Sequence, residues 1–126
     1  MTTSRPLRVL VVDDHPDGGE SCAELLRLMG HDARAAQSGA AALRTVAGFD
    51  PDVALLDLGL PDGDGFGLVG RLLAALPRRP VLVAVTGYGH LEARARQAGF
   101  DHYLLKPVEL AVLTDLLDRT AGRGGS

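Results

Sequence analysis

Hydrophobic and polar positions follow two alternating patterns along the chain, and together they predict an α/β fold. Three short runs, residues 9–12, 53–56 and 81–85, are apolar throughout. This pattern is typical of parallel strands that are buried on both faces of a sheet. Residues 32–36 and 102–105 are also strand-like. The first run extends back to residue 7. Together, these three runs and two further segments predict five strands.

Segments with a helical pattern follow each predicted strand. Residues 21–29 have apolar positions three and four apart, and Ser38 is a candidate N-cap for a second helix that ends near residue 47. The third helical pattern ends at Pro77, the fourth is a weaker one over residues 91–98, and the fifth covers residues 108–117. A strand–helix unit repeated five times predicts a doubly wound parallel sheet with right-handed crossovers.

The length of 126 residues suits one domain. Residues 1–6 are a polar extension, and we expect the domain to cover residues 7–120. Residues 121–126 are rich in glycine, which predicts a flexible tail. We expect no output domain after Arg119, and therefore no control of transcription by this chain alone.

Composition narrows the classes of function. The chain is 46% hydrophobic and 23% charged with a net charge of −3, and it has no broad basic stripe, which argues against nucleic-acid binding. No apolar stretch reaches the roughly 20 residues needed to cross a bilayer, and no secretory signal is visible, so we expect no membrane association. The lone cysteine, Cys22, cannot form an internal disulfide. These features predict a cytoplasmic protein.

Polar residues follow four of the five predicted strands. Asp13 and Asp14 follow the first, Asp57 the third, Thr86 the fourth and Lys106 the fifth. The carboxyl ends of parallel strands meet at one edge of the sheet, where ligands bind in such folds. We therefore expect three carboxylates, a hydroxyl and an ammonium group to lie together.

This set of groups suits phosphoryl chemistry on a carboxylate. Three neighbouring carboxylates repel one another, and Mg²⁺ relieves that repulsion and binds phosphate oxygens. A carboxylate next to the cation can then act as a nucleophile towards phosphorus. Lys106 and Thr86 can each contact a phosphoryl oxygen.

The sequence resembles the receiver domains of two-component response regulators, from about Leu7 to Arg119. The resemblance is carried by motifs in the same order and spacing: Asp13-Asp14, Asp57, Leu60-Pro61 with Asp64-Gly65, Thr86 and Lys106-Pro107. It implies a flavodoxin-like sheet with strand order 2-1-3-4-5. It also implies a bacterial cytoplasmic phosphoprotein that acts as a switch, and not as an enzyme beyond its own phosphorylation and dephosphorylation.

The resemblance assigns a role to each site residue. Asp57 is the phosphoacceptor and, with Asp14, a direct ligand of Mg²⁺, for which Mn²⁺ can substitute. Asp13 acts mostly through water, and the backbone carbonyl of Gly59 is the remaining protein ligand.

Two further roles follow from the resemblance. Lys106 and Thr86 hold the phosphoryl oxygens, and the peptide bond between Lys106 and Pro107 is cis. Phosphorylation draws Thr86 towards the phosphoryl group, and Tyr103 turns inward into the vacated space. An aromatic residue that closes a strand is, however, often simply part of the core.

The switch implies partners on two sides. A histidine kinase or a histidine phosphotransfer protein supplies the phosphoryl group. An output partner, which the sequence does not identify, binds the face formed by the fourth helix, fifth strand and fifth helix. We expect a monomer or a weak dimer. The chain reads equally as a stand-alone regulator, a phosphorelay intermediate or a receiver of the type attached to hybrid histidine kinases, to which residues 86–89 and 98–101 are similar.

Two other functions compete with this interpretation. A phosphohydrolase with an aspartyl-phosphate intermediate usually needs a second acid two residues after the nucleophile, where this chain has Gly59. An interaction domain that works without phosphorylation would not need the complete site. Two motifs also fail on context: the glycines at 65, 67 and 70 do not directly follow a strand, and the calcium-loop pattern from Asp62 ends in Leu73 instead of glutamate.

Overall fold

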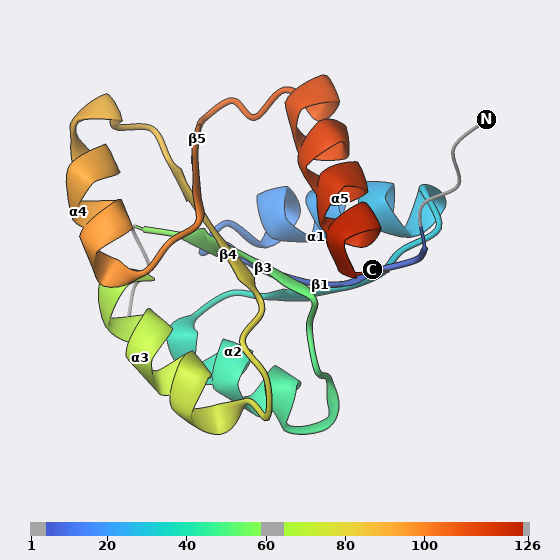
Figure 1. The fold of residues 1–126 in the computed structure, drawn as a ribbon, viewed down its shortest axis with the longest axis horizontal. Helices are drawn as coiled ribbons and strands as arrows, with labels where there is room; N and C mark the ends of the chain where they lie inside the picture. Colours follow the sequence, from blue (N-terminus) through green and yellow to red (C-terminus); the bar gives the residue numbers. More distant parts are fainter. Residues whose placement is uncertain (1–4, 59–64, 125–126) are drawn as a thin grey trace.

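The computed structural model describes residues 5–58 and 65–124. Strands and helices alternate along the chain (Figure 1). Their bounds are β1 Arg8–Val12, α1 Pro16–Leu28, β2 Asp32–Ala36, α2 Gly39–Thr45, the 3-10 helix η1 Val46–Gly48, β3 Val53–Asp57, α3 Gly65–Ala75, β4 Val81–Thr86, the 3-10 helix η2 Gly89–Leu91, α4 Glu92–Ala98, β5 His102–Leu105 and α5 Leu110–Gly124.

All strand pairs are parallel, and the order in the sheet is β2-β1-β3-β4-β5. This confirms the predicted fold class and strand order. In Figure 1, α1 and α5 lie on one side of the sheet and α2 and α3 on the other. Ala95, the buried residue of α4, belongs to the same hydrophobic cluster as the buried residues of α2 and α3.

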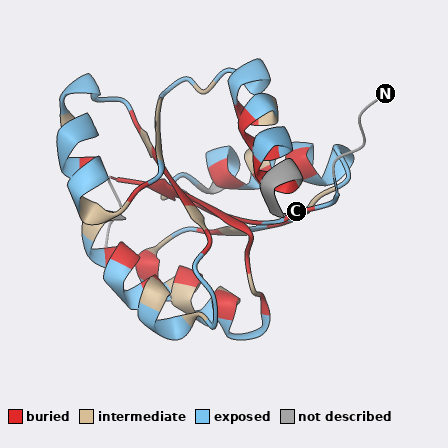
Figure 2. Ribbon diagram, in the orientation of Figure 1, coloured by how far each residue is buried: buried red, intermediate tan, exposed pale blue. Residues whose placement is uncertain are grey.

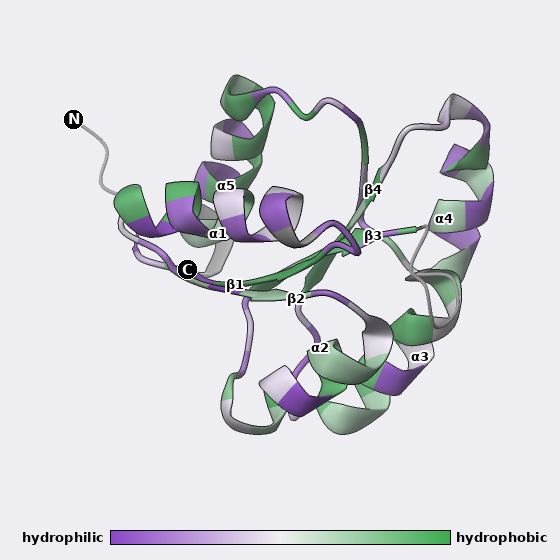
Figure 3. Ribbon diagram, turned by 180° about the vertical axis from the view of Figure 1, so that it is seen from behind, coloured by the Kyte–Doolittle hydropathy of each residue, from purple (hydrophilic) through white to green (hydrophobic). Residues whose placement is uncertain are grey.

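Each face of the sheet has its own hydrophobic cluster because successive side chains of a strand point to opposite faces. In β3, Val53 and Leu55 pack with the buried residues of α1 and α5, whereas Ala54 and Leu56 pack with those of α2 and α3. All five residues of β3 are buried (Figure 2). Seen from behind, the central strands are hydrophobic and hydrophilic positions lie on the helices (Figure 3). The uninterrupted apolar runs therefore do mark strands covered on both faces.

Most element boundaries agree with the sequence pattern. The side chain of Ser38 accepts a hydrogen bond from the backbone N–H of Ala41 at 3.1 Å, which confirms the predicted N-cap of α2. Helix α1 ends at Leu28, and Gly30, two residues further on, has a φ of 98°, in the left-handed region that favours glycine.

Two boundaries differ from the prediction. Helix α1 begins at Pro16, five residues before the start expected from its apolar face, because proline is well accommodated in the first helical turn. Helix α5 continues to Gly124, and Ala121 is buried in the cluster beside α1. The tail predicted over residues 121–126 therefore begins too early, since Ala121 still has a packing partner.

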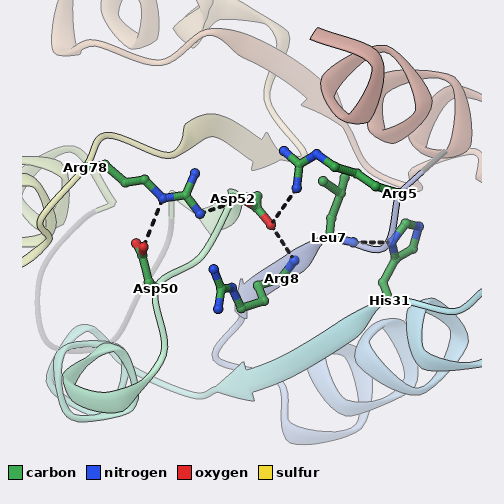
Figure 4. Close-up of polar contacts among 7 residues, drawn as sticks. All are labelled: Arg5, Leu7, Arg8, His31, Asp50, Asp52 and Arg78. Carbon is green, nitrogen blue, oxygen red and sulfur yellow. Dashed lines mark hydrogen bonds and ion pairs between the residues drawn. The ribbon is translucent and has the colours of Figure 1, made fainter. Parts of the chain in front are cut away.

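A polar cluster joins the amino ends of the strands, opposite the edge where the predicted site lies (Figure 4). The side chain of Asp52 is 5% exposed and accepts hydrogen bonds from the Arg8 backbone N–H at 2.8 Å and from the Arg78 guanidinium at 2.6 Å. Arg5 lies 3.7 Å from the same carboxylate, and Arg78 also binds Asp50. The cluster thus ties the segment before β4 to the starts of β1 and β3.

His31 forms a further polar contact at the amino ends of the strands. Its Nδ1 accepts a hydrogen bond from the backbone N–H of Leu7 at 3.0 Å. Burial lowers the pKa of His31, and Asp118 opposes that shift. The neutral imidazole is therefore the form that fits here, because a protonated Nδ1 could not accept this hydrogen bond.

Asp52→Asn is expected to destabilise the fold by about 2 kcal/mol at neutral pH, because Arg78 loses its buried charged partner. Burial alone raises the pKa of Asp52, but hydrogen bonds from Arg8 and Arg78 and the charges of Arg78 and Arg5 outweigh it and hold the pKa below 3.8. The stabilisation is present above pH 3.8 and is lost as the pH falls through the lower pKa of the folded state.

Urea denaturation across the acid range measures this prediction. The stability difference between wild type and Asp52→Asn should shrink as the pH drops below 3.8. Asp115→Asn, at a site that is 65% exposed on α5, is the control and should change stability little at any pH. A difference that stays constant through the acid range would contradict this role of Asp52.

Candidate functional site

The sheet brings the predicted site residues to one edge. Asp57 and Thr86 are the last residues of β3 and β4, Asp13 follows β1, and Lys106 follows β5. Backbone hydrogen bonds continue past the strands and fix these positions. The N–H of Asp13 donates to the backbone carbonyl of Ala36 at 3.0 Å, and the N–H of Lys106 donates to the backbone carbonyl of Thr86 at 2.8 Å. The strand register therefore sets the relative positions of the functional side chains.

The three carboxylates form a compact cluster. Asp13, Asp14 and Asp57 each offer an oxygen within 4.8 Å of the others. Asp57 is buried, with 7% of its surface exposed, and the other two are half-buried. An all-oxygen set of this charge fits a hard divalent cation such as Mg²⁺, which binds through one or two carboxylates and keeps several waters. Gly59, whose carbonyl the resemblance adds to the ligands, lies outside the described residues.

Lys106 neutralises part of this charge. Its Nζ lies 3.0 Å from Oδ2 of Asp57 and 3.9 Å from Oδ2 of Asp13. Burial on its own lowers the pKa of Lys106, but the hydrogen bond to Asp57 and the charges of the three aspartates raise it above its ordinary value. The side chain is therefore a permanent ammonium group beside the Asp57 carboxylate.

Two glycines that the sequence analysis did not assign to the site lie against Asp13. A Cβ added at Gly18 would lie 3.3 Å from Oδ2 of Asp13, and one at Gly19 would lie 3.2 Å from its Cβ. These contacts are tighter than most, so the glycines let the start of α1 approach the acidic cluster closely. Oδ1 of Asp13 also accepts a hydrogen bond from the backbone N–H of His15 at 2.9 Å.

Thr86 and Tyr103, the two predicted switch residues, are linked through the backbone of Tyr88. The Thr86 side chain is buried, and its oxygen accepts a hydrogen bond from the Tyr88 N–H at 3.2 Å. The Tyr103 hydroxyl donates to the Tyr88 carbonyl and accepts from the Leu91 N–H at 3.2 Å. Tyr103 is half-buried and also packs against the core. Movement of either side chain must therefore disturb the segment between β4 and α4.

The peptide bond between Lys106 and Pro107 is cis, which is the geometry that the resemblance implied. It is the one cis peptide bond found within residues 5–58 and 65–124. It follows directly after β5, so it lies where the chain leaves the sheet and presents Lys106.

A parallel sheet in this strand order, with an acidic cluster and a lysine at its carboxyl edge, is the arrangement of a receiver domain. Residues 9–118 match the response regulator receiver domain family, and the protein belongs to that family. Phosphorylation on an aspartate is general to these domains, which take part in bacterial two-component signalling with histidine kinases or phosphotransfer proteins as partners.

Curated relatives place the domain in several contexts. The chain is 38% identical over 121 residues to the transcriptional regulatory protein PrrA of Mycobacterium tuberculosis, covering 94% of this chain and 52% of PrrA. It is 31% identical over 118 residues to the sensor histidine kinase RcsC of Escherichia coli, covering 93% of this chain and 12% of RcsC. The chain thus spans about half of PrrA's length and a much smaller part of RcsC.

Solved structures agree with the fold. The CheY-like receiver domain of a response regulator from Methylobacillus flagellatus superposes with a TM-score of 0.83 at 33% identity, over 92% of this chain and 99% of that one. A response regulator from Burkholderia pseudomallei, solved with a phosphorylated aspartic acid, calcium and citrate, gives 0.79 at 25% identity, over 94% and 70%.

Across residues 5–58 and 65–124, no helix has both the length and the apolar character needed to span a bilayer.

Proposed function

We propose that Asp57 of this chain accepts the phosphoryl group, with a divalent cation held by Asp14 and Asp57 and, through water, by Asp13. The observation that carries the proposal is the geometry around Asp57: two further carboxylates offer oxygens within 4.8 Å, and the Lys106 ammonium lies 3.0 Å away. An aspartate with a purely structural role would not need two neighbouring carboxylates and an ammonium group.

The chemistry is an in-line transfer to a carboxylate. An Asp57 oxygen forms a bond to phosphorus while the bond from phosphorus to the donor nitrogen breaks, and the electron pair leaves with the donor imidazole. A bound Mg²⁺ supplies charge neutralisation on the phosphoryl oxygens, and Mn²⁺ can serve the same purpose. Lys106 exchanges its contact with Asp57 for one with a phosphoryl oxygen, and the Thr86 hydroxyl takes another. Water later hydrolyses the acyl phosphate, which restores the carboxylate.

The signal leaves the site through Thr86. When this side chain turns towards the phosphoryl group, the hydrogen bond that it accepts from Tyr88 is lost. Tyr88 also holds the Tyr103 hydroxyl, so the change reaches β5 and the face formed by α4, β5 and α5. Phosphorylation shifts the population between two conformers by its different interaction energy with each. An output partner binds that face, and the chain is a switch that catalyses only its own phosphorylation and dephosphorylation.

Intact mass after incubation with Mg²⁺ and a small phosphodonor tests this function. Wild type should gain one phosphoryl group, and Asp57→Asn should gain none. Chelation of Mg²⁺ should abolish the gain. Asp115→Asn, with its exposed carboxylate on α5, is the matched control and should behave as wild type. Equal phosphorylation of Asp57→Asn would show that another residue is the acceptor.

A further inference from the structure

A cavity of about 700 Å³ lies between α1, α5 and the sheet, and Asp13 and Asp57 of the acidic cluster form part of its wall. This volume is within the range of about 300–1,000 Å³ that is typical of small-molecule sites. Most of its wall is apolar and includes Leu25 of α1, Leu104 of β5 and Leu113 of α5.

The charged site residues Asp13, Asp57 and Lys106 line the cavity, so two carboxylates and one ammonium group face it. His15 and Ser21 are further polar residues of its wall. Asp14 belongs to the same acidic cluster and adds a further negative charge. The cavity therefore combines an apolar interior with a rim of net negative charge.

We propose that this cavity binds an amphiphilic cation, an aliphatic or aromatic group that carries an ammonium. The apolar part lies between Leu25 and Leu113, where contact with the apolar wall removes part of its surface from water. The ammonium lies at Asp13 and Asp57, where it shares these carboxylates with the Lys106 ammonium, and Asp14 keeps the charge of the cluster negative with both cations present. An anionic head group would instead meet the aspartates and be repelled.

Such a ligand shares carboxylates with the proposed metal site. An ammonium at Asp13 and Asp57 opposes binding of a divalent cation, because both need the same negative charge. Binding of the amphiphile itself does not depend on phosphorylation, whereas its competition with Mg²⁺ rests on the proposed function. The two can therefore be measured separately.

Cys22 gives a direct readout of occupancy. It is the only cysteine of the chain, it is half-buried, and it lines the cavity. Burial, and to a smaller extent Asp13, raise the pKa of its thiol, so little thiolate is present at neutral pH. We therefore assign Cys22 no reactivity of its own, and its slow alkylation by iodoacetamide serves as a probe of the cavity.

The experiment compares three eight-carbon ligands, octylammonium, octanol and octanoate, with metal-free protein below the concentration at which they aggregate. Octylammonium should slow alkylation of Cys22 and bind about tenfold more tightly by calorimetry than either of the others. Added Mg²⁺ should weaken octylammonium binding. Equal binding of all three, tighter binding of octanoate, or no protection of Cys22 would each overturn the proposal.

Three substitutions on helix α1 test where the ligand binds. Leu25→Trp fills the cavity and should abolish octylammonium binding by calorimetry, whereas Leu28→Trp, at an 80% exposed position outside the cavity, should leave it unchanged. Cys22→Met is a second filling variant in case the tryptophan disturbs folding, which circular dichroism checks. Binding retained by both filling variants in folded form would place the ligand elsewhere and contradict the inference.

Discussion

Lys106→Met is expected to slow phosphorylation of the protein by about two orders of magnitude, which is the effect of removing one well-placed charged donor from a transition state. Methionine keeps much of the side-chain volume but removes the ammonium that lies 3.0 Å from Asp57. The rate of mass gain with a small phosphodonor at saturating Mg²⁺ measures the effect.

The control for Lys106→Met is Arg119→Met. It removes a cation from a 68% exposed ion pair on α5 and should leave the rate unchanged. Lys106→Met should still bind Mg²⁺, because it loses a positive charge next to the three aspartates. A phosphorylation rate equal to wild type would mean that Lys106 only offsets the charge of the acidic cluster and does not contact the phosphoryl group.

Leu56→Ala is expected to cost about 2–5 kcal/mol of stability, a large part of the roughly 5–15 kcal/mol available to a domain. Leu56 is fully buried in the central strand β3, where it faces the cluster shared by α2 and α3 and lies between Val12 of β1 and Ala84 of β4. Truncation leaves a cavity that strands paired on both sides cannot close. Urea denaturation measures the loss.

Leu28→Ala is the matched control for Leu56→Ala. Leu28 is 80% exposed, and its truncation should change stability by no more than about 0.5 kcal/mol. Similar losses for the two variants would contradict the assignment of β3 to the centre of the core.

The fold was predictable because its strands are apolar on both faces. Residues 53–56 and 81–85 could be read as buried parallel strands without further information, and the structure places them side by side at the centre. The same rule brought the site together, since Asp57 and Lys106 needed only to follow their strands to reach one edge. The roles of these residues remain predictions that the experiments above test.

Long-range polar contacts were not predictable in this way. The sequence shows Asp52 and Arg78 as two ordinary charged residues, 26 positions apart, and only the register of β1, β3 and β4 brings them together. Gly18 and Gly19 carry no functional group that would indicate a role in the site, whereas the structure shows that they lie against Asp13. The link from Thr86 through Tyr88 to Tyr103 runs through backbone groups, which carry no sequence signal.

The phosphoryl group is expected to reside on Asp57 as an acyl phosphate. Phosphorylated protein can be reduced with borohydride, which converts an aspartyl phosphate to homoserine and leaves free carboxylates unchanged, and then mapped by peptide mass spectrometry. We expect homoserine at position 57 and unmodified aspartate at positions 13 and 14. Homoserine at either of those two positions, or a phosphoryl group that resists reduction, would contradict the assignment of Asp57 as the phosphoacceptor.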